Sequence, residues 1–145
     1  MQIASLSNLG SRIMFAMKQS RGKIIIAPDL NVWPHEYETA KALAMAGMTV
    51  EFIRRSEEHR TTSADVIVNG MEWAIKSPRS DKASAIDKNI RKALHQSKCV
   101  IFDSRRMKRV PDSTIEKELR KSASILRSMK HLVFVNRRGE VIDIK

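Results

Sequence analysis

The spacing of hydrophobic residues along the chain alternates between that of helices and that of strands. Apolar residues recur every three or four positions from His35 to Ala46, which predicts a helix that begins at Pro34 and ends at Gly47. The same spacing predicts a second helix ending near Gln96 and a third opening at Pro111–Asp112. Alternating or wholly apolar runs predict strands at residues 23–27, 48–53, 64–68, 71–76, 99–102, 132–135 and 141–144.

The order of these elements indicates an α/β fold. From His35 it runs helix, strand, strand, strand, helix, strand, with a helix and a hairpin appended. Asn69-Gly70 lies between the second and third of these strands and is a strong signal for a two-residue hairpin turn, so the two strands should be antiparallel. A chain of 145 residues fits one domain. We expect this domain over residues 23–145, preceded by a short N-terminal helix over residues 1–22.

The chain is strongly basic, with 27 Lys and Arg against 16 Asp and Glu, a formal net charge of +11 and a pI near 10.2. Such a charge favours an anionic partner, above all nucleic-acid phosphates, and less often an anionic membrane surface or an acidic protein. Eleven basic residues against three acidic ones lie between Lys76 and Arg109. The residues that we expect to contact nucleic acid are Lys82, Lys88, Arg91, Lys92, Arg105 and Arg106.

The alternative for these residues is an ordinary solvated basic face. The chain has only two Trp, one Tyr and four Phe, which argues against extensive base stacking. The composition therefore favours a structured nucleic acid that is recognised through its backbone.

Other function classes lack their sequence signals. Cys99 is the single cysteine, so neither a disulfide framework nor a cysteine-based zinc site is available. No apolar run reaches the roughly 18 residues of a membrane span, and the first residues do not have the pattern of a secretory signal. Glycine-rich nucleotide loops and the nucleophile elbow of hydrolases are also missing. We expect the domain to act in a reducing, aqueous compartment.

Acidic residues and a lysine are predicted to cluster around the Asn69-Gly70 hairpin. Glu72, Ala74 and Lys76 alternate onto one face of the third strand, and Asp65 lies on the partner strand. Glu36 falls in the first turn of the preceding helix. Phosphodiester cleavage requires carboxylates that hold a divalent metal and a cation near the developing charge, and hard oxygen ligands favour Mg²⁺ or Mn²⁺. Taken singly, each residue also has a plain structural explanation, such as capping a turn or ending a strand.

The sequence resembles the C-terminal tRNA nuclease domain of CdiA-type contact-dependent growth-inhibition toxins over roughly residues 22–145. The residues that carry the resemblance are Pro34-His35-Glu36, Thr39-Ala40, Ala46-Gly47, Val50-Glu51-Phe52-Ile53, Ala64-Asp65, Gly70, Trp73, Ile75-Lys76-Ser77-Pro78, Gln96, Asp103 and Arg105-Arg106. The resemblance implies a PD-(D/E)xK-like core, in which a helix, a three-stranded antiparallel meander, a helix and a strand follow one another. It also implies Asp65 as the metal-binding aspartate, Lys76 as the motif lysine and Glu36 as the acidic residue of the first helix.

One position departs from the family pattern. The residue two before the lysine should be acidic, and here it is Ala74. Three explanations remain open: an engineered Glu→Ala inactivation, which we favour, a naturally degenerate copy, or migration of the metal ligand to Glu72. Glu72 shares the face of the strand but lies about 7 Å further along it.

These observations predict a metal-dependent endoribonuclease toxin domain that cleaves tRNA and is weakened at position 74. The expected cofactor is Mg²⁺, with Mn²⁺ or Zn²⁺ as alternatives. The resemblance implies a cognate immunity protein and action in the bacterial cytoplasm, in a target cell after delivery from a larger secreted toxin. The rival hypotheses are a DNase of the same fold and a non-catalytic basic RNA-binding module.

Overall fold

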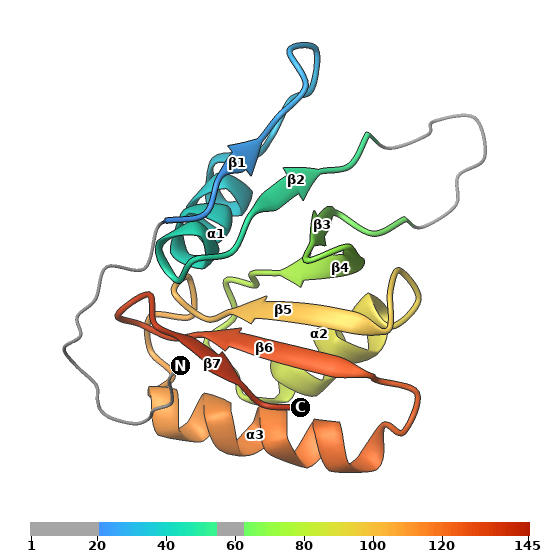
Figure 1. Cartoon of the computed structure of the whole chain (residues 1–145). Coiled ribbons are helices and arrows are strands. Elements are labelled where there is room, and N and C mark those ends of the chain that lie inside the picture. Colours follow the sequence, from blue (N-terminus) through green and yellow to red (C-terminus); the bar gives the residue numbers. More distant parts are fainter. Residues whose placement is uncertain (1–20, 55–62) are drawn as a thin grey trace, which may run out of the picture.

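The computed structural model describes residues 21–54 and 63–145 (Figure 1). The helix predicted over residues 1–22 falls almost wholly outside these residues. The strands are β1 (Ile24–Ile25), β2 (Val50–Phe52), β3 (Val66–Val68), β4 (Met71–Lys76), β5 (Cys99–Asp103), β6 (His131–Val135) and β7 (Val141–Asp143), and the helices are α1 (Pro34–Met45), α2 (Ser84–Ala93) and α3 (Asp112–Ile125). This order confirms the predicted sequence of elements. The helix α2 ends before the predicted end near Gln96, because residues 94–96 form a turn. The helix α3 ends before Leu126 and Met129, whose spacing continues its apolar pattern.

The seven strands form one mixed sheet in which each strand lies beside its neighbours in sequence. The pairs β2–β3, β3–β4 and β6–β7 are antiparallel, and the pairs β1–β2, β4–β5 and β5–β6 are parallel. Each parallel pair is connected through a helix, as parallel strands require. Asn69 and Gly70 have φ angles of 53° and 78°, which confirms the predicted tight turn between β3 and β4.

Helices cover both faces of the sheet and divide the core in two. On one face α1 packs over a cluster that includes Leu43, Val50, Trp73 and Ile101. On the other face α2 and α3 pack over a second cluster. Its largest fully buried members are Phe102, Phe134, Ile86, Ile90, Met107, Ile115, Leu119, Met129 and Leu132. The strand β5 is buried along its whole length because it lies between the two layers.

The two-sided cover changes the expected environment of β4. The sequence pattern indicates a single apolar face made of Met71, Trp73 and Ile75. Trp73 and Ile75 do lie in the core beneath α1, but Met71 is 39% exposed at the start of the strand. Ala74, on the opposite face, is fully buried in the core beneath α2 and α3. In the part of the chain that the structure describes, no helix has the length and apolar character needed to cross a membrane.

Candidate functional site

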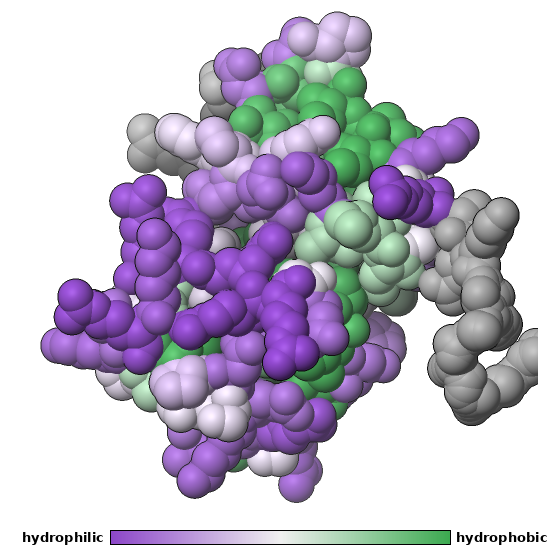
Figure 2. All heavy atoms as spheres, turned by 90° about the vertical axis from the view of Figure 1, so that its left-hand side faces the viewer, coloured by the Kyte–Doolittle hydropathy of each residue, from purple (hydrophilic) through white to green (hydrophobic). Residues whose placement is uncertain are grey.

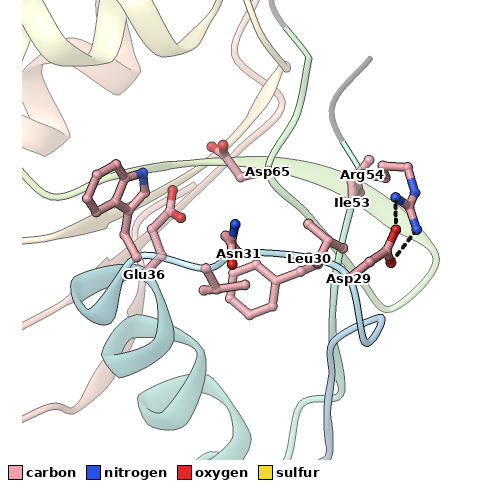
Figure 3. Close-up of a pocket in the computed structure, with 10 residues that line it drawn as sticks. Asp29, Leu30, Asn31, Glu36, Ile53, Arg54 and Asp65 are labelled. Atoms are coloured by element: carbon pink, nitrogen blue, oxygen red, sulfur yellow. Dashed lines mark hydrogen bonds and ion pairs between the residues drawn. The ribbon is translucent and has the colours of Figure 1, made fainter. Parts of the chain in front are cut away.

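Two carboxylates from distant parts of the sequence line one cavity on the α1 side of the sheet. The cavity, of about 280 Å³, is bounded by the segment 29–33, by Glu36, by residues 52–54 and by Asp65. Figure 3 shows the side chains of Glu36 and Asp65 extending toward the same space, with Asn31 between the two elements that carry them. The structure therefore brings together Glu36 and Asp65, two of the acidic residues singled out in the sequence.

The orientation of Asp65 is set by an irregularity at the start of β3. The Asp65 amide donates to the Trp73 carbonyl, although the register partner of Trp73 is Val66. Two residues on one strand thus oppose one residue on the other, as in a β-bulge, which redirects the side chain at that point. Oδ2 of Asp65 also accepts a hydrogen bond of 2.7 Å from the Ile75 amide. Asp65 is 5% exposed, so the backbone of β4 holds a largely buried carboxylate in place.

Glu36 lies in the first turn of α1, and a buried polar network ties this helix to the end of β5. Oγ1 of Thr39 donates to Oδ2 of Asp103 over 2.6 Å. The same carboxylate accepts hydrogen bonds from the Arg105 guanidinium, the shortest of 2.7 Å, while Nη2 of Arg105 also donates to the Glu38 carbonyl over 2.9 Å. The hydrogen bond to Asp103 raises the pKa of Arg105. The network fixes where the first turn of α1 lies relative to the sheet.

The outer side of the carboxylate cavity carries an ion pair between Asp29 and Arg54 (Figure 3). The two side chains meet through two hydrogen bonds, and the hydrogen bond to Arg54 lowers the pKa of Asp29. Both residues are well exposed. The pair joins the loop before α1 to the end of β2, which are two walls of the cavity.

The other predicted site residues lie elsewhere. Glu72 is exposed at the start of β4, where its carbonyl accepts a hydrogen bond from Ser97. Ala74 is enclosed by apolar side chains of the α2 and α3 layer. Lys76 is half-buried at the end of β4, one residue beyond the Ile75 amide that binds Asp65. Lys76 follows in sequence the residue whose amide holds Asp65, but the structure brings none of Glu72, Ala74 and Lys76 to the cavity lining.

The two carboxylates of the cavity suit a metal ion that needs few protein ligands. Within residues 21–54 and 63–145, no group of three or more His, Cys, Asp or Glu side chains is placed to hold a metal ion. Mg²⁺ is commonly bound through one or two carboxylates and keeps several waters, whereas structural zinc requires four protein ligands. Glu36 and Asp65 therefore fit Mg²⁺ or Mn²⁺ better than Zn²⁺.

A second, larger cavity of about 620 Å³ adjoins the first, because Trp33 lines both. We call it the basic cavity. Its lining residues are Trp33, Pro34, His35, Arg79, Asp81, Arg106, Lys108 and Arg109. Four basic side chains and one carboxylate meet there. Hydrophilic side chains gather on the face of the molecule shown in Figure 2, the side of Figure 1 on which β5 and β6 end.

The structure separates the predicted nucleic-acid contacts into different groups. Arg106 lines the basic cavity, whereas Arg105 is engaged by Asp103 and Arg91 by Asp87. Lys82, Lys88 and Lys92 are exposed on α2 or just before it. Three further basic members of this cavity, Arg79, Lys108 and Arg109, fall within the basic stretch from Lys76 to Arg109 that the sequence indicates for phosphate contacts. No signal in the sequence pointed to Trp33.

Comparisons with known proteins agree with the resemblance seen in the sequence. The model of the contact-dependent growth inhibition CdiA C-terminal domain matches residues 62–141, just over half of the chain. A chain of a solved structure, described as a CdiA-CT/CdiI toxin and immunity complex from Burkholderia pseudomallei, has a similar fold with a TM-score of 0.66. The two chains are 16% identical, and the match covers 86% of this chain and 99% of the other. Among curated proteins no match was found. The chain belongs to the contact-dependent growth inhibition CdiA C-terminal domain family and is a growth-inhibiting toxin domain.

Proposed function

We propose that this toxin domain is a metal-dependent nuclease that cleaves tRNA, with Glu36 and Asp65 as its metal-binding carboxylates. One observation carries the proposal: the two carboxylates converge on one cavity that adjoins a second cavity rich in basic side chains. Carboxylates can hold a divalent metal that assists phosphodiester hydrolysis, and basic side chains bind the flanking phosphates. The family membership supports a toxic activity but leaves its chemistry open.

Each side chain of the proposed site has its own role in the cleavage. Asp65 and Glu36 would hold Mg²⁺ or Mn²⁺, which supplies Lewis-acid polarisation of the phosphate and a more acidic bound water. The hydrogen bond from the Ile75 amide orients Asp65, so little reorganisation is needed when substrate binds. Lys76 ends β4 on the strand face of Ala74 and does not line the cavity. We therefore propose that its long side chain reaches the substrate around the end of the strand, where its ammonium group would stabilise negative charge that develops on the phosphate.

The order of the core elements supports a PD-(D/E)xK-like nuclease. The helix α1, the antiparallel meander β2–β3–β4, the helix α2 and the strand β5 follow the order of that core. The family pattern would add a carboxylate at position 74, but Ala74 is enclosed by apolar side chains. We therefore propose a site with two carboxylates, in which Ala74 belongs to the core.

The proposed function also includes a protein partner and a place of action. The similar solved structure is a toxin and immunity complex, which supports a cognate immunity protein for this chain as well. An acidic immunity protein would be attracted to the basic surface around Arg79 and Arg106. Since tRNA is cytoplasmic, the toxin would act in the bacterial cytoplasm, in a target cell after delivery from a larger secreted toxin.

A cleavage assay tests this function. The purified chain is incubated with total tRNA and plasmid DNA in one reaction, with Mg²⁺, with Mn²⁺ or with EDTA. We expect metal-dependent tRNA cleavage that Glu36→Gln and Asp65→Asn abolish, while the matched exposed replacements Glu38→Gln and Asp143→Asn leave it unchanged. Cleavage of the plasmid instead would identify a DNase. Salt-sensitive tRNA binding without cleavage under any metal would overturn the enzyme in favour of a binding module.

A further inference from the structure

An exposed aromatic ring lies on the wall between the carboxylate cavity and the basic cavity. The side chain of Trp33, three residues before Glu36, is 64% exposed and lines both cavities. The His35 ring is stacked against it, with ring centroids 6.4 Å apart and planes 24° from parallel. This contact orients the indole while leaving most of its surface open. An indole in this state is a platform on which a nucleobase can stack.

The residues that line the basic cavity beside Trp33 carry an excess of positive charge. Arg79, Arg106, Lys108 and Arg109 line it together with a single carboxylate, Asp81. None of the ion pairs found in the described ranges includes any of these four basic residues. Burial and the neighbouring Arg79 both lower the pKa of Arg106. An anion in the cavity would relieve this repulsion between guanidinium groups, and two arginines suit a phosphate because each can donate two parallel hydrogen bonds.

The arrangement combines an exposed aromatic ring, a cluster of basic side chains and a carboxylate pair in two adjoining cavities. A base that is paired within a helix has both faces covered by its neighbours, so it cannot stack on a protein side chain. An unpaired nucleotide offers a free base and a flexible backbone together. The basic cavity therefore fits a nucleotide of a single-stranded or loop segment and not a paired one.

We propose that Trp33, with Arg79 and Arg106, forms a subsite for one unpaired nucleotide next to the bond that is cut. The base stacks on Trp33, its phosphate is bound by the two arginines, and the neighbouring phosphodiester lies over Glu36 and Asp65. This inference rests on the proposed nuclease function for the position of the scissile bond. Binding of an unpaired nucleotide does not depend on that function. The domain would accordingly cut RNA in loops or single-stranded ends and spare paired stems.

Binding without cleavage tests the subsite. A fluorescently labelled single-stranded RNA oligonucleotide and the same strand annealed to its complement are titrated with the whole chain in EDTA, with anisotropy as the readout. We expect Trp33→Leu to weaken binding of the single strand about tenfold or more and to leave duplex binding unchanged. Tyr37→Leu removes a different exposed aromatic side chain, which lies within α1, and should change neither affinity.

The arginines are tested in the same titration at several salt concentrations. Arg79→Gln and Arg106→Gln should each weaken binding of the single strand. Each should also make the slope of the logarithm of the binding constant against the logarithm of the salt concentration less steep, by about 0.7 for each lost phosphate contact. Arg127→Gln, an exposed arginine beyond α3, removes the same charge and should have little effect. Quenching of intrinsic fluorescence by the oligonucleotide should disappear in Trp33→Leu, because the other tryptophan, Trp73, is buried.

The outcomes separate the subsite from the proposed function. Equal loss of single-stranded and duplex binding in Trp33→Leu, or no loss at all, overturns the subsite. Preserved cleavage in Asp65→Asn overturns the proposed function, and the binding result for Trp33 then stands independently. Circular dichroism of each variant confirms that it folds before its affinity is compared.

Discussion

The buried network that joins α1 to β5 gives the sharpest prediction for stability. Asp103 is 2% exposed and accepts hydrogen bonds from Thr39, from the Arg105 amide and from the Arg105 guanidinium. Replacing Arg105 by Gln removes the guanidinium and leaves a buried carboxylate with only the other two donors. It also removes the hydrogen bond to the Glu38 carbonyl. We expect Arg105→Gln to lower both the stability of the domain and the positional order of α1.

The expected loss follows from the burial of the pair. Removing one partner of a buried ion pair costs about 3–5 kcal/mol, because the remaining charge is left without compensation. Two donors to Asp103 remain and Arg105 is itself 28% exposed, so the cost should lie near the lower end, at about 3 kcal/mol. With a urea slope of about 2 kcal/mol/M for a domain of this size, the unfolding midpoint should fall by about 1.5 M.

Urea unfolding followed by circular dichroism measures this loss directly. The matched control is Arg120→Gln, which breaks the exposed pair with Glu116 within one helix and should cost about 0.5 kcal/mol or less. Equal midpoints for the two variants would refute the reasoning that the Asp103 network holds α1 in place. Under the proposed function, Arg105→Gln should also reduce tRNA cleavage at temperatures where the variant remains folded, because Glu36 lies on the same helix.

Three further predictions concern single side chains. Ala74→Glu buries a carboxylate in the apolar layer beneath α2 and α3, so it should lower the free energy of unfolding in urea by about 3 kcal/mol or more. Unchanged stability with a gain of cleavage would instead assign position 74 to the site. The hydrogen bond from Arg91 lowers the pKa of Asp87. The ionised Asp87 carboxylate therefore stabilises the fold above the usual carboxyl pKa, and this stabilisation is lost as the pH falls below about 4. The stability difference between the wild type and Asp87→Asn should shrink there, and a difference independent of pH would contradict this. Burial raises the pKa of the Cys99 thiol, so a disulfide reagent at pH 8 should label it slowly until urea is added; rapid labelling of the folded chain would show an accessible thiol.

The sequence allowed the element order to be predicted because each element carries a local signal. The Asn69-Gly70 turn and the apolar spacing after Pro34 depend only on neighbouring residues. The environment of β4 was not predictable in this way. Alternation assigns the side chains of β4 to two faces of the sheet, but it does not show that helices cover both faces. The pattern therefore indicated Ala74 as a site position, whereas the structure buries it beneath α2 and α3.

The candidate site was predictable only where a local signal in the sequence marks its residues. Asp65 and Glu36 were singled out from their places beside the predicted hairpin and in the first turn of a helix, and the family pattern marks the same residues. Neither signal contains the irregular pairing that turns Asp65 toward α1. The basic cavity draws on three separate segments, around Trp33, Arg79 and Arg106, and no local pattern connects them. The density of basic residues indicated the segments around Arg79 and Arg106. It did not indicate that Trp33, more than forty positions earlier, lies beside them.

The strand order of the sheet has a consequence for how this toxin domain can vary. Because the strands lie in the order of the sequence, no strand is inserted between two others, and the chain can be divided without leaving a gap in the sheet. The family model matches residues 62–141, the part from β3 onward, whereas Glu36 and Trp33 belong to the part before it. That earlier part adjoins the rest through the β2–β3 pairing and the contact of Thr39 with Asp103. The part before β3, which carries Trp33 and Glu36, can therefore vary as a unit between related toxin domains, while the matched part retains Asp65, Arg79 and Arg106.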